Sequence, residues 1–259
     1  MKKASSFTGF IMLTIASFWL QSCSKDDSEE PLIVTPASIS MHYEDTQQLS
    51  AEGATSWLSN DEFVAKVNSS GLITANHVGT TEIIVSNGKK NATCSVTVTP
   101  EYYLYDDPIL NWGASKAEIE SAEKHKKVSS SNSDMLTFDY SFGSNACVMG
   151  YSFENGKLKN IMAMFDYSLY LRAGYYLLER YQPIAAGNDY DYVLIDALKK
   201  EKCKTIVYFA AYKSGKTTYT TIMYSDYSSI KSASTRSVAE YNPEMNKMQE
   251  TLVGTYKQK

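Results

Sequence analysis

The sequence predicts an all-β sandwich followed by an α+β domain. In residues 32–99, short segments that alternate apolar and polar side chains are separated by turn residues, a pattern typical of small β-sandwiches. In residues 101–227, helical and strand patterns follow one another instead. The chain has 20 tyrosines, and only Tyr43 precedes residue 101. We therefore expect two separate cores, and 259 residues suffice for two modest domains.

The N-terminal segment has the order of regions found in a secretory signal peptide. Lys2 and Lys3 give it a basic start, and an almost uncharged apolar run extends from Phe7 to Leu20. This run has about 14 residues, whereas a membrane-spanning helix, which is the alternative, needs roughly 20. A Leu-Gln-Ser-Cys sequence then ends at Cys23. We predict that residues 1–22 are a signal peptide.

With Cys23 as the first mature residue, the segment resembles the signal of bacterial lipoproteins, whose cysteine is acylated and becomes the new N-terminus. The resemblance implies that Cys23 carries palmitate-type chains that anchor the protein in a membrane. Residues 23–31 form an acidic, polar tether that contains Ser24-Lys25-Asp26-Asp27. This tether resembles the signal that sends lipoproteins of the Bacteroidota to the outer face of the outer membrane. It implies a cell-surface location, and a plain flexible linker is the alternative.

The charge of the chain bears on its partners. The formal net charge is −4, and removal of the signal peptide takes away Lys2 and Lys3. Nucleic-acid binding depends on clustered Lys and Arg, which a mildly acidic chain of this kind does not provide. We therefore expect no nucleic-acid partner.

Three cysteines remain besides Cys23, and an odd number leaves at least one outside any internal disulfide. Cys94 lies in an alternating strand pattern, so we expect it to be a buried thiol. The spacing of Cys147 and Cys203 leaves open whether these two form a disulfide.

The first domain carries a family resemblance. Asn87-Gly88 is a strong hairpin signal, Trp57 is the expected core aromatic, and Gly71 is expected to supply a positive φ. Strand patterns cover residues 33–40, 47–51, 81–85 and 93–99. The region resembles the bacterial Ig-like group 2 (Big2) domain through Ile39, Leu49, Trp57-Leu58-Ser59-Asn60, Val64-Ala65-Lys66-Val67, Gly71-Leu72-Ile73-Thr74-Ala75, Gly79-Thr80-Thr81 and Cys94-Ser95-Val96-Thr97-Val98. The resemblance implies an Ig-like sandwich that serves as a spacer or adhesion-type module and has no catalytic residues.

Helices and strands are both predicted in the second domain. Ser115 and Glu118 have the spacing of a capping box, which predicts a helix that ends near Lys124. A second helix is predicted over residues 167–181, with Pro183 as its end. Predicted strands cover residues 135–140, 147–153, 158–165, 192–198, 205–212 and 217–224.

The second domain also contains a weak internal repeat. Gly156-Lys157 and Gly215-Lys216 each lie in a turn between two predicted strands, and Asp-Tyr-Ser follows each hairpin. This predicts a repeat of one helix plus three strands, with two helices on one face of an antiparallel sheet. The architecture resembles the β-lactamase-inhibitor-protein-like domains, whose repeats act in protein binding. Residues 228–259 read as a Ser-rich linker and a short amphipathic helix over 243–253, for which docking and disorder both stay open.

No catalytic residues, metal site or cofactor site are predicted. Ala210 to Thr217 fits a permissive nucleotide-loop pattern with alanine in place of the first glycine, but a β-branched strand follows where such a loop needs a helix. Asp106-Asp107 and Asp189 to Asp191 lack a full Ca²⁺ loop pattern, so we expect solvated carboxylates. No metal-ligand spacing links the histidines His42, His77 and His125.

Tyrosines are the candidate ligand-binding residues. Tyr208 and Tyr212 share one face of their predicted strand, and Tyr219 lies on the next strand. Aromatic rings on a sheet stack on sugars or anchor a protein partner, and packing in a core is the alternative. We therefore expect a non-enzymatic, lipid-anchored surface protein whose Ig-like stalk presents the α+β domain to a protein or glycan. The alternatives are an envelope hydrolase whose site forms only in space, and an envelope structural or assembly component.

Overall fold

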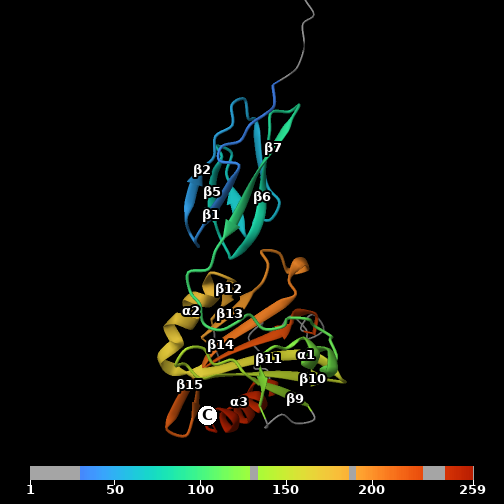
Figure 1. Ribbon diagram of the computed structural model, residues 1–259, viewed down its shortest axis with the longest axis vertical. Helices are drawn as coiled ribbons and strands as arrows, with labels where there is room; N and C mark the ends of the chain where they lie inside the picture. The colour runs from blue at the N-terminus through green and yellow to red at the C-terminus, as the bar shows by residue number, and fades with distance from the viewer. Residues whose placement is uncertain (1–29, 129–133, 187–190, 230–242, 259) are drawn as a thin grey trace, which may run out of the picture. The chain divides into compact units, whose positions relative to one another are not determined.

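The computed structural model describes residues 30–128, 134–186, 191–229 and 243–258. The predicted signal peptide, Cys23, most of the tether and most of the Ser-rich linker lie outside these residues. The described part of the chain is mostly β-sheet, with three α-helices (Figure 1).

Residues 32–99 form two sheets around one core. The first sheet has the strand order β1-β7-β6-β3, with β1 parallel to β7 and the other pairs antiparallel. The second is antiparallel, with the order β2-β5-β4. The strands are β1 (Ser38–Met41), β2 (Thr46–Gln48), β3 (Ser56–Ser59), β4 (Ala65–Val67), β5 (Leu72–Ala75), β6 (Gly79–Ser86) and β7 (Asn91–Val98).

Alternating side chains build this core. Ile83 on β6 and Cys94 on β7 are fully buried, and they pack in one cluster with Ile73 of the other sheet. Trp57 is half-buried and packs against the same cluster. The positive φ predicted for Gly71 is confirmed, at +83°, and a Cβ there would lie 2.8 Å from the Trp57 ring. Backbone conformation and ring packing therefore both require glycine at this turn.

Residues 126–226 form one eight-stranded antiparallel sheet with the order β12-β13-β14-β15-β11-β10-β9-β8 (Figure 1). Each half of the sheet is a set of consecutive strands, and the two sets meet where β11 pairs with β15. The first set is β8 (Lys126–Lys127), β9 (Met135–Asp139), β10 (Cys147–Glu154) and β11 (Lys157–Asp166); the second is β12 (Gln182–Ala185), β13 (Tyr192–Ile195), β14 (Thr205–Ser214) and β15 (Thr217–Asp226).

The local signals behind the repeat have matching structures. The β10–β11 and β14–β15 hairpins turn at Gly156 and Gly215, both with positive φ. After each hairpin, an aspartate accepts a hydrogen bond from a serine amide two residues on: Asp166 from Ser168 at 2.8 Å and Asp226 from Ser228 at 3.0 Å. A 3₁₀ turn follows each aspartate, η1 (Tyr167–Leu169) and η3 (Tyr227–Ser229).

The outer strands β8 and β12 were not predicted from the sequence. Lys126 and Lys127 make up the whole of β8, whereas β12 contains Pro183 and an irregular register beside it. Charged residues, proline and bulges all discourage pairing with a further strand. The residues that discourage further pairing at the two edges of the sheet are thus the same residues that made β8 and β12 difficult to predict as strands.

Helix α1 (Lys116–Ala122) begins at the predicted capping box. Ser115 accepts from the Glu118 amide at 3.3 Å, and the Glu118 carboxylate accepts from the Ser115 amide at 2.7 Å. The helix ends before Glu123, which has extended backbone angles. The second predicted helix is shorter than expected, because only Tyr170–Leu178 forms α2 and Pro183 lies in β12.

Helix α3 (Pro243–Tyr256) docks on the sheet, which answers the question that the sequence left open. It continues through Gly254, where an end was expected. The residues of α1 and α2 that pack inward belong to one cluster of the sheet, and Met245, Met248 and Leu252 of α3 belong to the other. Successive residues of β14 divide between these clusters, so α3 covers the face opposite α1 and α2 (Figure 1).

The three described cysteines are buried thiols rather than disulfides. Cys94 is buried as predicted. Cys147 packs in the cluster that contains α2, whereas Cys203 packs in the cluster that contains α3. The two thiols therefore face opposite sides of the eight-stranded sheet.

Candidate functional site

The tyrosines predicted as ligand-binding residues lie on the sheet face that α3 covers. Tyr208 is 5% exposed and Tyr219 is 3% exposed, and Tyr212 is half-buried against the same cluster. The Tyr219 ring meets Tyr256 of α3 edge-on, with centroids 5.4 Å apart. A ligand would reach Tyr219 only by displacing Tyr256 of α3, and Tyr208 is buried in the same cluster. The exposed aromatic surface of this domain lies on the other face.

That surface is a groove of about 240 Å³ between α2 and strands β13 and β14, which we call the aromatic groove. Leu171, Tyr175 and Tyr192 line it and are 72%, 53% and 48% exposed. Pockets that enclose a drug-sized ligand measure roughly 300–1,000 Å³. The aromatic groove is therefore the size for one ring or one side chain of a longer ligand.

The rings in the aromatic groove form a continuous row. Tyr170 stacks on Phe209 with centroids 4.6 Å apart, and Tyr192 is nearly parallel to Phe209 with centroids 6.4 Å apart. Phe209 is 1% exposed and fixes this row to the core. A row of rings held in this way offers a rigid apolar surface whose ordering on binding costs little side-chain entropy.

Gly174 lies in the middle of α2 and opens the aromatic groove. Glycine inside a helix costs roughly 0.5–1 kcal/mol relative to alanine. Neither a positive φ nor close packing requires it here, because an added Cβ would lie 3.9 Å from the Phe209 ring, an ordinary contact. The missing side chain keeps the space over Phe209 open, which is the only consequence of this glycine that the local structure shows.

A carboxylate next to two lining residues, Tyr170 and Tyr192, lies beside the aromatic groove without being part of its lining. Asp191 precedes Tyr192, and its Oδ2 accepts a hydrogen bond from the Ala211 amide at 3.0 Å. Burial, followed by hydrogen bonding with Asp191, raises the pKa of Tyr170. The groove thus combines ring faces with one negatively charged acceptor.

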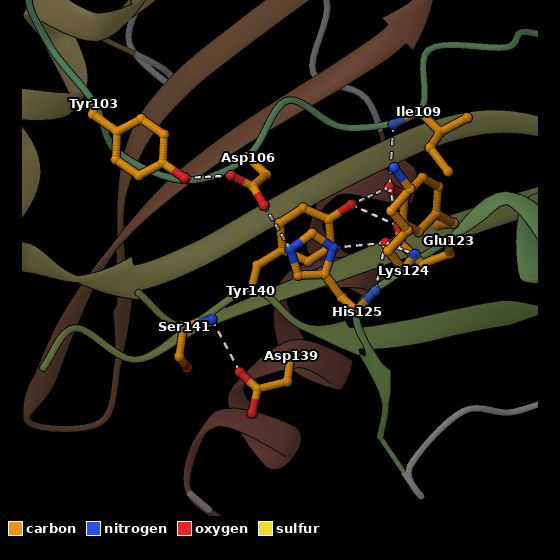
Figure 2. Close-up of polar contacts among 10 residues, drawn as sticks. Tyr103, Asp106, Ile109, Glu123, Lys124, His125, Asp139, Tyr140 and Ser141 are labelled. Atoms are coloured by element: carbon orange, nitrogen blue, oxygen red, sulfur yellow. Dashed lines mark hydrogen bonds and ion pairs between the residues drawn. The ribbon is translucent and has the colours of Figure 1, made fainter. Parts of the chain in front are cut away.

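A second cluster of polar side chains surrounds Glu123, directly after α1 (Figure 2). Its side chain is 2% exposed. One carboxylate oxygen accepts from the Lys124 amide at 2.8 Å, the His125 amide at 3.0 Å and Nδ1 of His125 at 2.6 Å. The other accepts from the hydroxyls of Tyr140 at 2.6 Å and Tyr151 at 2.9 Å. We call this set the Glu123 cluster.

The Glu123 cluster reaches the surface through His125. Nε2 of His125 lies 3.2 Å from the exposed carboxylate of Asp106, and Nδ1 faces Glu123, so both ring nitrogens face carboxylates. The His125 ring also stacks on Tyr140. Tyr151 in turn accepts from the Ile109 amide at 3.2 Å. The segment that enters the domain is thereby tied to α1, β9 and β10.

The contacts of Glu123 argue against a catalytic role. A carboxylate offers about four lone-pair sites, and five donors already occupy those of Glu123. A general base needs an oxygen or nitrogen that can reach a substrate proton. The described geometry therefore fits a structural anchor. Sequence reasoning treated His125 as isolated and did not identify this cluster.

The pKa of Glu123 predicts a specific acid sensitivity. Burial alone would raise this pKa, but the hydrogen bonds from Tyr140, His125 and Tyr151 outweigh burial and hold it below its ordinary 4.5. The stabilisation is therefore complete above the unfolded pKa and is lost as pH falls through the folded value. We expect the free energy of unfolding of wild type and Glu123→Gln to differ by a constant amount above about pH 5, and this difference to shrink progressively as pH falls below that. Urea titrations across this range check the expectation, and a difference that does not change with pH contradicts it.

Glu179 holds the same entering segment at another point. Its side chain is 1% exposed and accepts from the amides of Glu101 at 2.9 Å and Tyr102 at 3.1 Å. Arg180 donates to the same carboxylate. Glu179 directly, and Glu123 through His125 and Tyr151, thus fix the segment from Glu101 to Ile109 to the domain. Neither glutamate lines the aromatic groove.

Comparisons with known proteins give little further information. No protein-family model matches the sequence, and no curated protein matches it. Among solved structures, the chain is similar to domains 5–6 of the S-layer protein SbsC, with 12% identity over 76% of this chain and 83% of that chain. The TM-score is 0.24, and we draw no conclusion from this likeness.

Two kinds of feature are absent from the described residues. In that part of the chain, no helix combines the length and apolar character needed to cross a bilayer. The same residues contain no group of three or more His, Cys, Asp or Glu side chains arranged to hold a metal ion.

Proposed function

We propose that the protein is a lipid-anchored surface lipoprotein that binds a ligand through the aromatic groove. Acylated Cys23 is the anchor, residues 32–99 are a Big2-type Ig-like stalk, and residues 101–227 are the α+β binding domain. The sequence around Cys23 supports the anchor, and the order of the blocks from Ile39 to Val98 supports the stalk. The ligand is a protein or a glycan.

The exposed rings of the aromatic groove are the observation that carries the binding role. Tyr175, Tyr192 and Leu171 are about half-exposed or more, although the sheet beside them buries most of its aromatic side chains. Clustered apolar exposure of this kind marks interaction sites more often than chance placement does. Gly174 adds to this, because it keeps the groove open at a cost in helix stability.

The other two functions have less support. A hydrolase would use the Glu123 cluster, whose carboxylate is already saturated by protein donors. An assembly component would place another envelope protein in the aromatic groove. The assembly hypothesis therefore shares the proposed site and differs only in the ligand. Binding experiments with groove variants and candidate ligands would distinguish the two hypotheses.

Cys23→Ala is expected to abolish the anchor. The thiol is the atom that receives lipid in the lipoprotein signal, so the variant should incorporate no labelled palmitate and should leave the membrane fraction. Cys94→Ala, which removes a buried thiol, is the matched control and should stay labelled. Protease shaving of intact cells then tests the location. Labelling of Cys23→Ala, or protection of the wild type from external protease, would refute the anchor or the surface location respectively.

A further inference from the structure

We propose that the aromatic groove takes one sugar ring of an uncharged glycan. This inference rests on the binding role proposed above and names the ligand class. It requires three properties of the site: an apolar face for the carbon side of a sugar, acceptors for its hydroxyls, and an electrostatic environment that disfavours anions.

The rings supply the apolar face. Tyr192 is 48% exposed at one side of the groove, and Tyr175 is 53% exposed at the other. A pyranose has a face of C–H groups, and a rigid aromatic ring covers such a face without loss of hydrogen bonds. The volume of about 240 Å³ accommodates one such ring and leaves the rest of the chain outside.

Asp191 supplies acceptors. Its carboxylate offers about four lone-pair sites, and among the described residues the Ala211 amide and Tyr170 account for two of them. The remaining sites suit the hydroxyl groups of a ligand. Among the described residues, no ion pair neutralises Asp191, so it also repels a negatively charged ligand.

The charges of the groove distinguish between ligands. Its lining residues are aromatic, leucine and glycine, and none is basic. Phosphate, sulfate and uronic-acid ligands need cationic or amide donors, which this lining does not offer. A basic peptide would need several acidic side chains, whereas Asp191 alone is present and half its acceptor sites are occupied. An uncharged polyhydroxyl ligand matches both the single acceptor and the ring faces.

The experiment compares ligands of known charge on the full mature chain in detergent. Isothermal titration uses neutral hexasaccharides (maltohexaose, cellohexaose and laminarihexaose), the acidic hexagalacturonate, and leucine-rich peptides with and without lysine. We expect at least one neutral hexasaccharide to bind, and hexagalacturonate to bind at least tenfold more weakly or not at all.

Matched variants locate the binding. Tyr192→Ala should weaken binding of the neutral sugar at least tenfold, and Asp191→Asn should weaken it about tenfold. Gly174→Ala narrows the groove with an ordinary contact to Phe209, and Gly174→Leu fills it; binding should fall in that order. Tyr103→Ala, which removes an equally exposed tyrosine at 48% outside the groove, should leave binding unchanged.

The possible outcomes separate this inference from the proposed function. Peptide binding that depends on Tyr192, without sugar binding, overturns the glycan inference and keeps the groove as a protein-binding site. Equal binding of acidic and neutral sugars overturns the electrostatic argument. Sugar binding that none of the four groove variants changes removes the groove from the proposed function. Absence of binding by all these ligands counts against both.

Discussion

Replacing Glu123 with alanine is expected to lower the free energy of unfolding by roughly 2–5 kcal/mol. The substitution removes the acceptor of five hydrogen bonds and leaves the hydroxyls of Tyr140 and Tyr151 in the interior with one proton each. These hydroxyls lie 2.8 Å apart, so one can still donate to the other, but not both. One buried donor is left without its acceptor, and His125 loses its inner partner. Urea denaturation followed by intrinsic fluorescence measures the change.

Two further variants make this prediction specific. Glu123→Gln keeps one carbonyl oxygen and should fall between wild type and alanine. Glu120→Ala removes a glutamate of α1, the helix that precedes Glu123, and its partner Lys127 is also exposed, so it should cost less than about 1 kcal/mol. Equal losses for Glu123→Ala and Glu120→Ala would contradict the role of the cluster as an anchor.

Local sequence signals predicted most of the central elements of the described fold. Each of these signals is contained in a short stretch of sequence: the Ser115–Glu118 capping box, the two glycine hairpins, and the alternation of side chains along β14 and β15. In the first domain, the strand patterns missed β3, β4 and β5. In the eight-stranded sheet, the strands that the sequence did not predict are the outermost ones. Lysine and proline are favoured on edge strands because they discourage pairing with a further strand, and they are uncommon in central strands. The sequence pattern of Lys126-Lys127 and of the segment around Pro183 therefore did not indicate a strand.

The candidate sites were not predicted because they depend on distant parts of the chain. Tyr208 and Tyr212 share a face of β14, as expected, but no local pattern shows that α3 packs on this face. The Glu123 cluster brings together residues from 106 to 151. One local sign existed: an acidic residue at the end of a helix opposes the helix dipole, so Glu123 had to be stabilised by something else.

Two glycines are likewise unfavourable in the element where they lie, and so point to contacts with distant parts of the chain. Gly174 breaks the rule against glycine in helices and opens the aromatic groove, and Gly150 breaks the rule against glycine in strands. In both cases the glycine lowers the stability of its own element but serves a tertiary feature. Gly174 leaves space for the aromatic groove, and Gly150 leaves space for Leu252 of α3. Residues that contradict the propensity of their own element are therefore the best places in a single sequence to look for tertiary contacts.

The contact between Gly150 and α3 leads to the second large effect. Gly150 lies in the interior of β10, and a Cβ there would be 3.0 Å from Sδ of Met135 and 3.1 Å from Cδ2 of Leu252. Leu252 is fully buried against this strand. Leu252→Ala should therefore cost about 2–5 kcal/mol through lost burial and a cavity. Gly150→Ala should cost about 1–3 kcal/mol through overpacking.

The double variant tests whether α3 occupies this position in solution. If the new methyl of Gly150→Ala enters the space that Leu252→Ala vacates, the two losses are not additive, and their coupling should reach about 0.5–3 kcal/mol. Gly254→Ala is the control on the same helix, because nothing lies within 4 Å of its added Cβ. It should leave stability unchanged or raise it by up to about 1 kcal/mol. Additive losses in the double variant would show that α3 and β10 do not pack through these two residues, and would contradict the docking of α3 at this point of the sheet.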